Sequence, residues 1–145
     1  MITRVRTVLA GDAAEIAALI TLLGYPCTPD EAADRLRVAA TEHDQALLVA
    51  DRNGELCGML GLDLMYYLPL GARTCRITAL VVATAHQGEG VGRELLQSAE
   101  TWARRAGATR IEVTSAAHRN EAHAFYRACG YGDGSMRFVK RLGDA

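Results

Sequence analysis

Residues 87–92 read QGEGVG, a run with three glycines between an apolar stretch and a helical pattern. The preceding RITALVV is typical of a strand, and the following GRELLQSAETWARRAG has the apolar spacing of a helix. At such a junction glycine lets the backbone approach a ligand closely, and the first N–H groups of the helix lack partners. The helix dipole also attracts negative charge. The stretch therefore has the chemistry of an anion-binding loop.

Two other phosphate-binding patterns do not fit this run. A nucleoside-triphosphate loop requires Lys and then Ser or Thr after its last glycine, whereas Arg93 and Glu94 follow Gly92. A dinucleotide fingerprint requires GxGxxG, and Gly88, Gly90 and Gly92 are spaced differently. The remaining pattern, QxxGxG, places successive N–H groups at a helix start, and a plain glycine-rich turn is its alternative.

A second stretch, IEVTSAAHRNEAHAFYRACGY, carries further reactive side chains after the helix. Together with ITALVV, the glycine run and GRELLQSAE, it resembles the GNAT superfamily of acetyl-CoA-dependent N-acetyltransferases, in a branch with an HRxxAHxFY-type motif. The resemblance covers roughly residues 76–131. It implies acetyl-CoA as cosubstrate, without a metal, and a small-molecule or peptide amine as the acceptor.

The resemblance also implies how the coenzyme binds. Backbone N–H groups of 87–92 would bind the pyrophosphate of coenzyme A, and the pantetheine arm would extend along the preceding strand as an added strand does. The family's loop Asn is replaced by Arg119, so Asn120 either supplies that contact from a shifted helix start or caps the helix. Arg93 either binds a phosphate or lies in solvent. The implied coenzyme-binding residues are Leu80, Val81, Val82, Gln87, Gly88, Glu89, Gly90, Val91, Gly92, Arg93, Arg119, Asn120 and Tyr126.

Attack of an amine on a thioester requires a base, a stabilised oxyanion and a departing thiolate. By its match to the family's general acid, Tyr126 would assist the sulfur, mainly by a hydrogen bond because the pKa of tyrosine, about 10, exceeds that of a thiol, about 8.5. A backbone N–H near Val82 would bind the oxyanion. Glu112 fits members with a fifth-strand base; Asp63, His118, a water molecule or an acceptor amine of low pKa are alternatives. A core tyrosine and a strand-surface glutamate are the structural alternatives for Tyr126 and Glu112.

Two rival interpretations remain open. A nucleophilic Cys129 would give a covalent acetyl-enzyme, but it falls at a helix end where the dipole disfavours a thiolate, so direct transfer is expected. A non-catalytic acyl-CoA sensor or interaction module on the same fold is the alternative function. It is motivated by Arg119 and by the fourth-strand stretch 76–79, which has no carboxylate.

The elements that would position these residues follow the order β-α-α-β-β-β-α-β-α-β. This order predicts an α/β (α+β) fold, and the resemblance implies a GNAT-like mixed, mostly antiparallel sheet of about six strands with about four helices. Asp12 and the TPDE capping box at 28–31 would begin the first two helices, and Asn53-Gly54 would close a hairpin. MRFVKRL would be the last strand, whose free edge predicts a homodimer.

The acceptor would be enclosed by the link between the first two helices and by DLMYYLPLGARTC. Tyr25, Tyr66 and Tyr67 are the candidate substrate-binding side chains, and an apolar core position is the alternative for each. A small amine, an aminoglycoside-like sugar amine, a protein N-terminus and a lysine all remain open as acceptors.

The composition limits the remaining function classes. The 145 residues are expected to form a single domain, 1–145, and half of them are apolar. A net charge of −1 gives no support for nucleic-acid or membrane binding. No apolar run is long enough to span a bilayer, and the first residues lack a signal-peptide core. The four cysteines form no CxxC pair, which argues against zinc and predicts reduced thiols in a cytoplasmic protein.

Overall fold

The computed structural model describes residues 2–114, 120–134 and 137–143. They belong to two units, Met1–Val113 and Thr114–Ala145, and each unit is described by itself. The first unit contains β1 (Arg4–Thr7), a 3₁₀ turn η1 (Ala10–Asp12), α1 (Ala13–Leu23), α2 (Pro29–Ala39), β2 (Gln45–Arg52), β3 (Glu55–Tyr67), β4 (Ala72–Val82), a second 3₁₀ turn η2 (Thr84–His86), α3 (Val91–Arg105) and β5 (Ala108–Val113).

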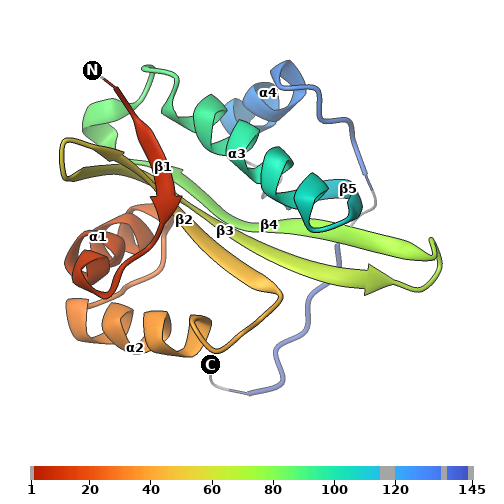
Figure 1. Cartoon of the computed structure of the whole chain (residues 1–145), viewed down its shortest axis with the longest axis horizontal. Coiled ribbons are helices and arrows are strands. Elements are labelled where there is room, and N and C mark those ends of the chain that lie inside the picture. The colour runs from red at the N-terminus through yellow and green to blue at the C-terminus, as the bar shows by residue number, and fades with distance from the viewer. Residues whose placement is uncertain (1, 115–119, 135–136, 144–145) are drawn as a thin grey trace. The chain divides into compact units, whose positions relative to one another are not determined.

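Five strands of the first unit form one sheet in the order of the chain, β1-β2-β3-β4-β5 (Figure 1). The first four strands are antiparallel neighbours, and β5 runs parallel to β4 because α3 connects them. The predicted hairpin is confirmed: Asn53 and Gly54 have φ angles of 54° and 87°, as a type I′ turn requires. The mixed, mostly antiparallel fold is therefore confirmed.

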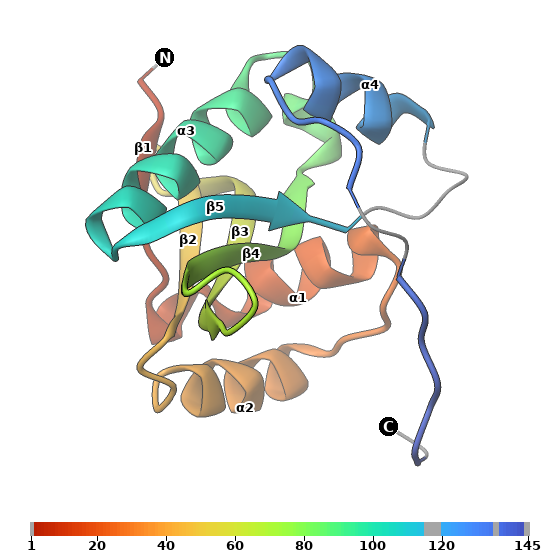
Figure 2. The same cartoon turned by 90° about the vertical axis from the view of Figure 1, so that its right-hand side faces the viewer.

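Helices cover both faces of this sheet. Figures 1 and 2 show α1 and α2 on one face and α3 on the other. The predicted capping box of α2 is present, since Thr28 Oγ1 accepts the Glu31 N–H at 3.1 Å and Glu31 accepts the Thr28 N–H at 2.9 Å. The core beneath α1 and α2 includes Ile16, Ala17, Leu19, Ala32, Val49, Leu56 and Met59, and α3 buries Val91, Leu95, Leu96, Ala99 and Ala103.

The second unit contains α4 (Asn120–Ala128), which confirms the predicted helix within the described residues. The predicted last strand is wrong for residues 137–142, which form no strand in the structure. Phe138 and Leu142 are about nine-tenths exposed. The apolar side chains of this segment therefore pack against nothing that would stabilise a strand. The homodimer expected through that edge stays a prediction, and Met136 lies outside the described residues.

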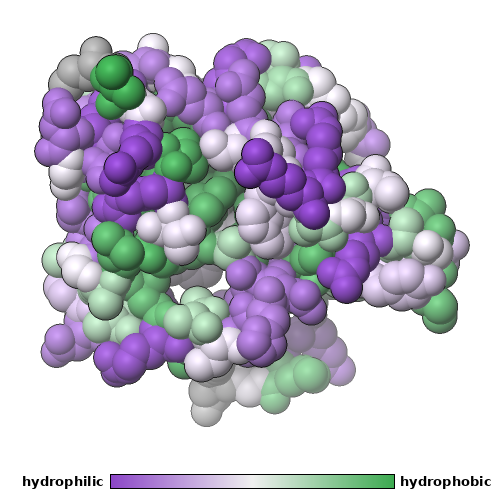
Figure 3. Space-filling view, in the orientation of Figure 1, coloured by the Kyte–Doolittle hydropathy of each residue, from purple (hydrophilic) through white to green (hydrophobic). Residues whose placement is uncertain are grey.

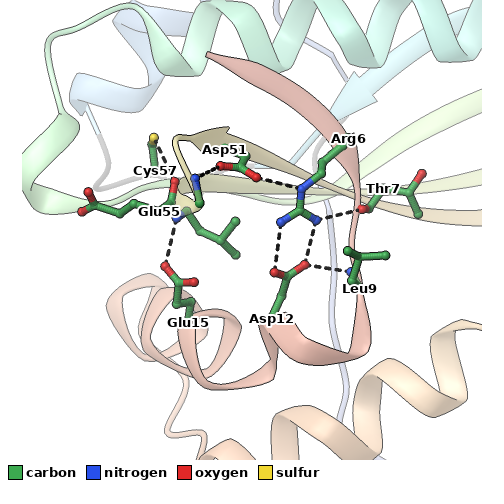
Figure 4. A network of polar contacts seen from close by, with 10 residues as sticks. Arg6, Thr7, Leu9, Asp12, Glu15, Asp51, Glu55 and Cys57 are labelled. Atoms are coloured by element: carbon green, nitrogen blue, oxygen red, sulfur yellow. Dashed lines mark hydrogen bonds and ion pairs between the residues drawn. The ribbon is translucent and has the colours of Figure 1, made fainter. Parts of the chain in front are cut away.

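Arg6 connects β1, β2 and the start of α1 (Figure 4). Its guanidinium contacts both carboxylate oxygens of Asp12, at 2.9 and 3.1 Å, and one oxygen of Asp51 at 3.0 Å. Asp12 also accepts the Leu9 N–H at 2.7 Å. The expectation that the Asp12 side chain caps α1 is therefore wrong, because its oxygens bind Arg6 and Leu9 instead. Hydrogen bonds from Arg6 lower the pKa values of Asp12 and Asp51.

Replacing Asp12 tests this connection. Asp12→Asn should lower the free energy of unfolding at pH 7 by about 2–3 kcal/mol, because it leaves a mostly buried guanidinium with one carboxylate. Since folding lowers the pKa of Asp12, its contribution is present above its ordinary pKa near 4 and is lost as the pH falls through the lower folded value. The stability difference should therefore shrink below about pH 4 in urea titrations.

Asp34 provides the matched control, because its ion pair with Arg37 lies on the exposed surface of α2. Asp34→Asn should change the free energy of unfolding by less than about 0.5 kcal/mol. Equal stability of Asp12→Asn and Asp34→Asn at pH 7, or a deficit that does not change with pH, would contradict a stabilising role for this ion pair.

Candidate functional site

The glycine run forms the predicted loop between β4 and α3. Gly88 and Gly90 have φ angles of 81° and 85°, which side-chain-bearing residues rarely adopt. A Cβ on either residue would meet nothing within 4 Å, so the backbone conformation and not the space around it requires glycine. Gly92 lies in the first turn of α3 and has no positive φ, so backbone strain does not explain its presence.

The N–H groups of this loop and of the helix start face no acceptor in the described part of the chain. The first hydrogen bond of α3 joins the Glu94 N–H to the Gly90 carbonyl at 3.1 Å. None of the described residues accepts a hydrogen bond from the N–H groups of 88–93. Residues 87–90 are exposed, and so is the guanidinium of Arg93. These donors and the positive end of the helix dipole together favour an anion.

The strand that leads into this loop has an open edge. β4 pairs with β3 as far as Val82 but with β5 only as far as Ile77 (Figure 2). Past Ile77, no described strand lies on the β5 side of β4. The Ala83 N–H donates to Cys57 O at 2.7 Å, and the antiparallel alternation then directs the polar backbone groups of Leu80 and Val82 toward the open edge. Those of Val81 face β3.

Gln87 fixes the end of this edge. Its side-chain Nε2 donates to the Val82 carbonyl at 3.3 Å, across the turn that separates β4 from the loop. The side chain of Gln87 is therefore used inside the protein, while its backbone belongs to the exposed loop.

A β-bulge interrupts β4 just before the open edge. Gly61 pairs with Ala79 and Leu62 pairs with Ile77, which leaves Thr78 as the extra residue. Gly61 makes room for it, because a Cβ there would lie 2.6 Å from Thr78 Oγ1. No residue of β4 itself indicated the bulge, but a glycine inside the apolar run ELCGMLGLDL was a usable signal for one.

Comparison with known proteins identifies the family. A model of the acetyltransferase (GNAT) family matches residues 14–131. The chain belongs to this family.

Individual relatives agree with this membership. An aminoalkylphosphonate N-acetyltransferase from Salmonella typhimurium is 38% identical over 94 residues, which are 65% of this chain and 61% of that relative. The chain thus spans about three fifths of that relative. An aminoglycoside N(6')-acetyltransferase type 1 from Stenotrophomonas maltophilia is 29% identical over 136 residues, which cover 90% of this chain and 89% of the relative.

A solved structure, that of a transcriptional regulator from Bacillus halodurans, has the same fold. Its TM-score is 0.90 at 20% sequence identity, and the match covers 97% of this chain and 100% of the other. At this identity the likeness concerns the fold alone.

In this GNAT family member, the predicted base Glu112 is held by arginine. Arg76 Nε and NH2 lie 3.0 and 2.9 Å from one oxygen of Glu112, and Arg110 lies 3.7 Å from the other. Arg76 is the register partner of both Glu112 on β5 and Asp63 on β3, so all three project from one face. Asp63 is half-buried, and its carboxylate makes no hydrogen bond or ion pair with any described residue. His118, another candidate base, lies outside the described residues.

The predicted acceptor residues are all at the surface of the first unit. Tyr25 and Tyr66 are mostly exposed and Tyr67 is about one-third exposed, so none of them occupies the core. The Arg110 guanidinium lies 5.0 Å from the centre of the Tyr67 ring. Leu68 and Leu70 give the tip of the β3–β4 hairpin an apolar surface (Figure 3). The acceptor wall itself stays a prediction.

In the second unit, Tyr126 is half-buried within an aromatic group. Its ring centroid lies 5.4 Å from that of Phe125 and 5.9 Å from that of Tyr131. Cys129 follows the last residue of α4, so the expected position at the helix end is confirmed. Asn120 is the first residue of α4, and Arg119 lies outside the described residues.

The two buried thiols, those of Cys57 and Cys75, are unsuited to nucleophilic attack. Burial raises the pKa of Cys75 to about 11 and also raises the pKa of Cys57. Within the described ranges, no three His, Cys, Asp or Glu side chains gather as a metal site would require. No helix in those ranges is long and apolar enough to cross a membrane.

Gly61→Ala tests the close approach at the bulge. The new Cβ would overlap Thr78 Oγ1, so the free energy of unfolding should fall by about 1–3 kcal/mol in chemical denaturation. The exposed side chain of Thr78 allows a rescue: Thr78→Ala should be nearly neutral alone and should restore most of the loss in the double variant.

Gly11→Ala is the matched control, since a Cβ there meets nothing within 4 Å and Gly11 has no positive φ. If Gly61→Ala costs no more stability than Gly11→Ala, or if Thr78→Ala fails to rescue it, the bulge does not depend on this contact.

Proposed function

We propose that the protein is an N-acetyltransferase that moves an acetyl group from acetyl-CoA to a primary amine by direct attack on the thioester. One observation carries the proposal: the open edge of β4 leads within a few residues into the unsatisfied N–H groups of 88–93. A coenzyme with an extended amide-containing arm and a diphosphate needs both kinds of backbone partner, in that order.

The first unit provides each of these partners from the backbone. The backbone groups of Leu80 and Val82 would pair with the amides of the pantetheine arm as a neighbouring strand would. The backbone groups of Val81 face β3, so Val81 would line the arm without forming these hydrogen bonds. The N–H groups of 88–93 would bind the diphosphate, and the exposed Arg93 would add a charge-assisted bond. Because the side chain of Gln87 binds Val82 O, its contribution is to connect the two parts of the site.

The chemical steps are assigned to three groups. The bulge at Thr78 interrupts the regular pairing of β4, and a backbone N–H of the open edge that follows, near Val82, would bind the oxyanion. Tyr126 would hydrogen-bond to the departing sulfur, an assignment that rests on the family pattern. Glu112 is the proposed base, and Asp63 is the other carboxylate on the same sheet face.

The ion pair between Arg76 and Glu112 supports a second candidate function. A carboxylate that already accepts a hydrogen bond from Arg76 Nε and forms an ion pair with Arg76 NH2 is less available to take a proton from an amine. If no other group takes the proton, the domain would be an acyl-CoA sensor that binds the coenzyme without acetyl transfer.

A thiol-release assay with a panel of amines distinguishes the two functions. The acetyltransferase relatives suggest the first acceptors, aminoalkylphosphonates and aminoglycosides, to which peptide N-termini and lysine peptides should be added. We expect acceptor-dependent release of coenzyme A with at least one class. Coenzyme binding in titration calorimetry without turnover on any class would favour the sensor instead.

Two substitutions should separate coenzyme binding from chemistry. Gly92→Val should weaken coenzyme A binding by about 2 kcal/mol, because a side chain at the second residue of α3 crowds the N–H groups that would bind phosphate. Tyr126→Phe should leave this affinity nearly unchanged and lower kcat, since its hydroxyl would act on the departing sulfur. Calorimetry and steady-state rates measure the pair.

Gln97→Val controls for valine in an α-helix, because Gln97 is exposed on the same helix and away from its first turn. It should bind coenzyme A as the parent protein does. Unchanged affinity in folded Gly92→Val would mean that the diphosphate binds elsewhere.

A further inference from the structure

A cluster of charged side chains lies under the glycine loop. Glu89, within the loop, accepts Arg52 NH1 at 2.6 Å and lies 2.9 Å from His86 Nδ1 through the same oxygen. The other imidazole nitrogen, Nε2, lies 3.3 Å from Glu55. Arg52 ends β2, Glu55 begins β3 and His86 ends η2, so these side-chain contacts join the β2–β3 hairpin to the segment between β4 and α3. The ribbon of that segment lies beside the hairpin in Figure 1.

Arg52 and His86 are both buried, so their contacts with Glu89 are not those of freely moving surface side chains. Arg52 and His86 are only 9% and 8% exposed, although 87–90 around them are exposed. Burial of a guanidinium lowers the stability of the fold unless its N–H groups donate hydrogen bonds. Arg52 Nε donates to Thr3 Oγ1 at 2.6 Å, and Arg52 NH1 donates to Glu89. The contacts thus fix the direction of the Glu89 side chain.

The direction of Glu89 determines what the loop presents to solvent. Glu89 lies between Gly88 and Gly90, whose backbones both have positive φ. With its carboxylate held by Arg52 and His86, the residue between these two flexible positions has fewer conformations open to it. That restriction would reduce the entropy that the neighbouring N–H groups lose when a ligand binds.

We propose that Glu89 is a positioning residue for the coenzyme: Arg52 and His86 hold its carboxylate so that the N–H groups of 88–93 are preorganised for a diphosphate. The inference rests on the proposed function. Glu89 would not touch the coenzyme through its side chain, and its negative charge is offset by Arg52 and, when protonated, by His86.

The direction in which Glu89→Ala changes the affinity for coenzyme A distinguishes a positioning role from a purely electrostatic one. If Glu89 acted only by its charge, Glu89→Ala would strengthen binding of the anionic coenzyme. Positioning predicts the opposite: the dissociation constant for coenzyme A and KM for acetyl-CoA should rise about five- to tenfold, with a smaller change in kcat. Glu89→Gln, which keeps an oxygen acceptor for Arg52, should recover most of the affinity.

The pH dependence gives a second readout. Hydrogen bonds to Glu89 and then Glu55 raise the pKa of His86, and Arg52 is the other charged group that binds Glu89. The protonated form, and with it the full set of contacts, is present at low pH and is lost as the pH rises through this raised value. Coenzyme affinity should fall over that range, and the fall should be absent from His86→Gln once the titration of the coenzyme's own phosphate is subtracted.

Titration calorimetry with coenzyme A, beside thermal unfolding, decides the proposal. Asp12→Asn is the control, because it breaks a comparable arginine–carboxylate pair elsewhere and should reduce stability without changing affinity. Affinity of Glu89→Ala equal to or tighter than that of the parent overturns the positioning role and leaves the proposed function intact. Absence of coenzyme A binding by the parent protein overturns both.

Discussion

The proposed coenzyme site depends on backbone groups that the sheet leaves without strand partners where β4 leaves β5. Strand pairing on that side ends at Ile77, while β3 continues to hold β4 as far as Val82. The edge is thereby left open, and it leads through the glycine loop into a helix whose first N–H groups have no acceptor among the described residues. Because the binding groups belong to the backbone, their positions depend on whatever fixes the path of the chain.

Several contacts fix that path. The bulge at Thr78 is accommodated by Gly61, and α3 is anchored by its buried apolar face. Arg6 holds β1, β2 and the start of α1 together. The loop itself would be too mobile with glycine on both sides of Glu89, unless the contacts from Arg52 and His86 restricted it. Apolar packing and the close approach at Gly61 thus position the open edge of β4. In the proposed arrangement, the charged contacts of Glu89 position the loop.

The sequence predicted the features that depend on local chemistry. The capping box at Thr28, the Asn53-Gly54 hairpin and the loop at Gly88 and Gly90 each need particular residue types at short spacing, and all three are confirmed. Contacts between distant segments left no such local pattern. Neither the pairing of Arg76 with Glu112 nor the burial of His86 could be read from neighbouring residues. The last strand failed because its apolar alternation, from Phe138 to Leu142, is not buried.

In the proposed binding mode, backbone N–H groups of one continuous stretch bind coenzyme A. Backbone amide chemical shifts of isotope-labelled protein, followed while coenzyme A is added, test this binding mode residue by residue. We expect the largest changes on the amides of 88–93 and on those of Leu80 and Val82, with smaller changes at Val81, whose N–H faces β3. Saturable binding that leaves these amides unchanged, with the largest shifts elsewhere, would contradict it.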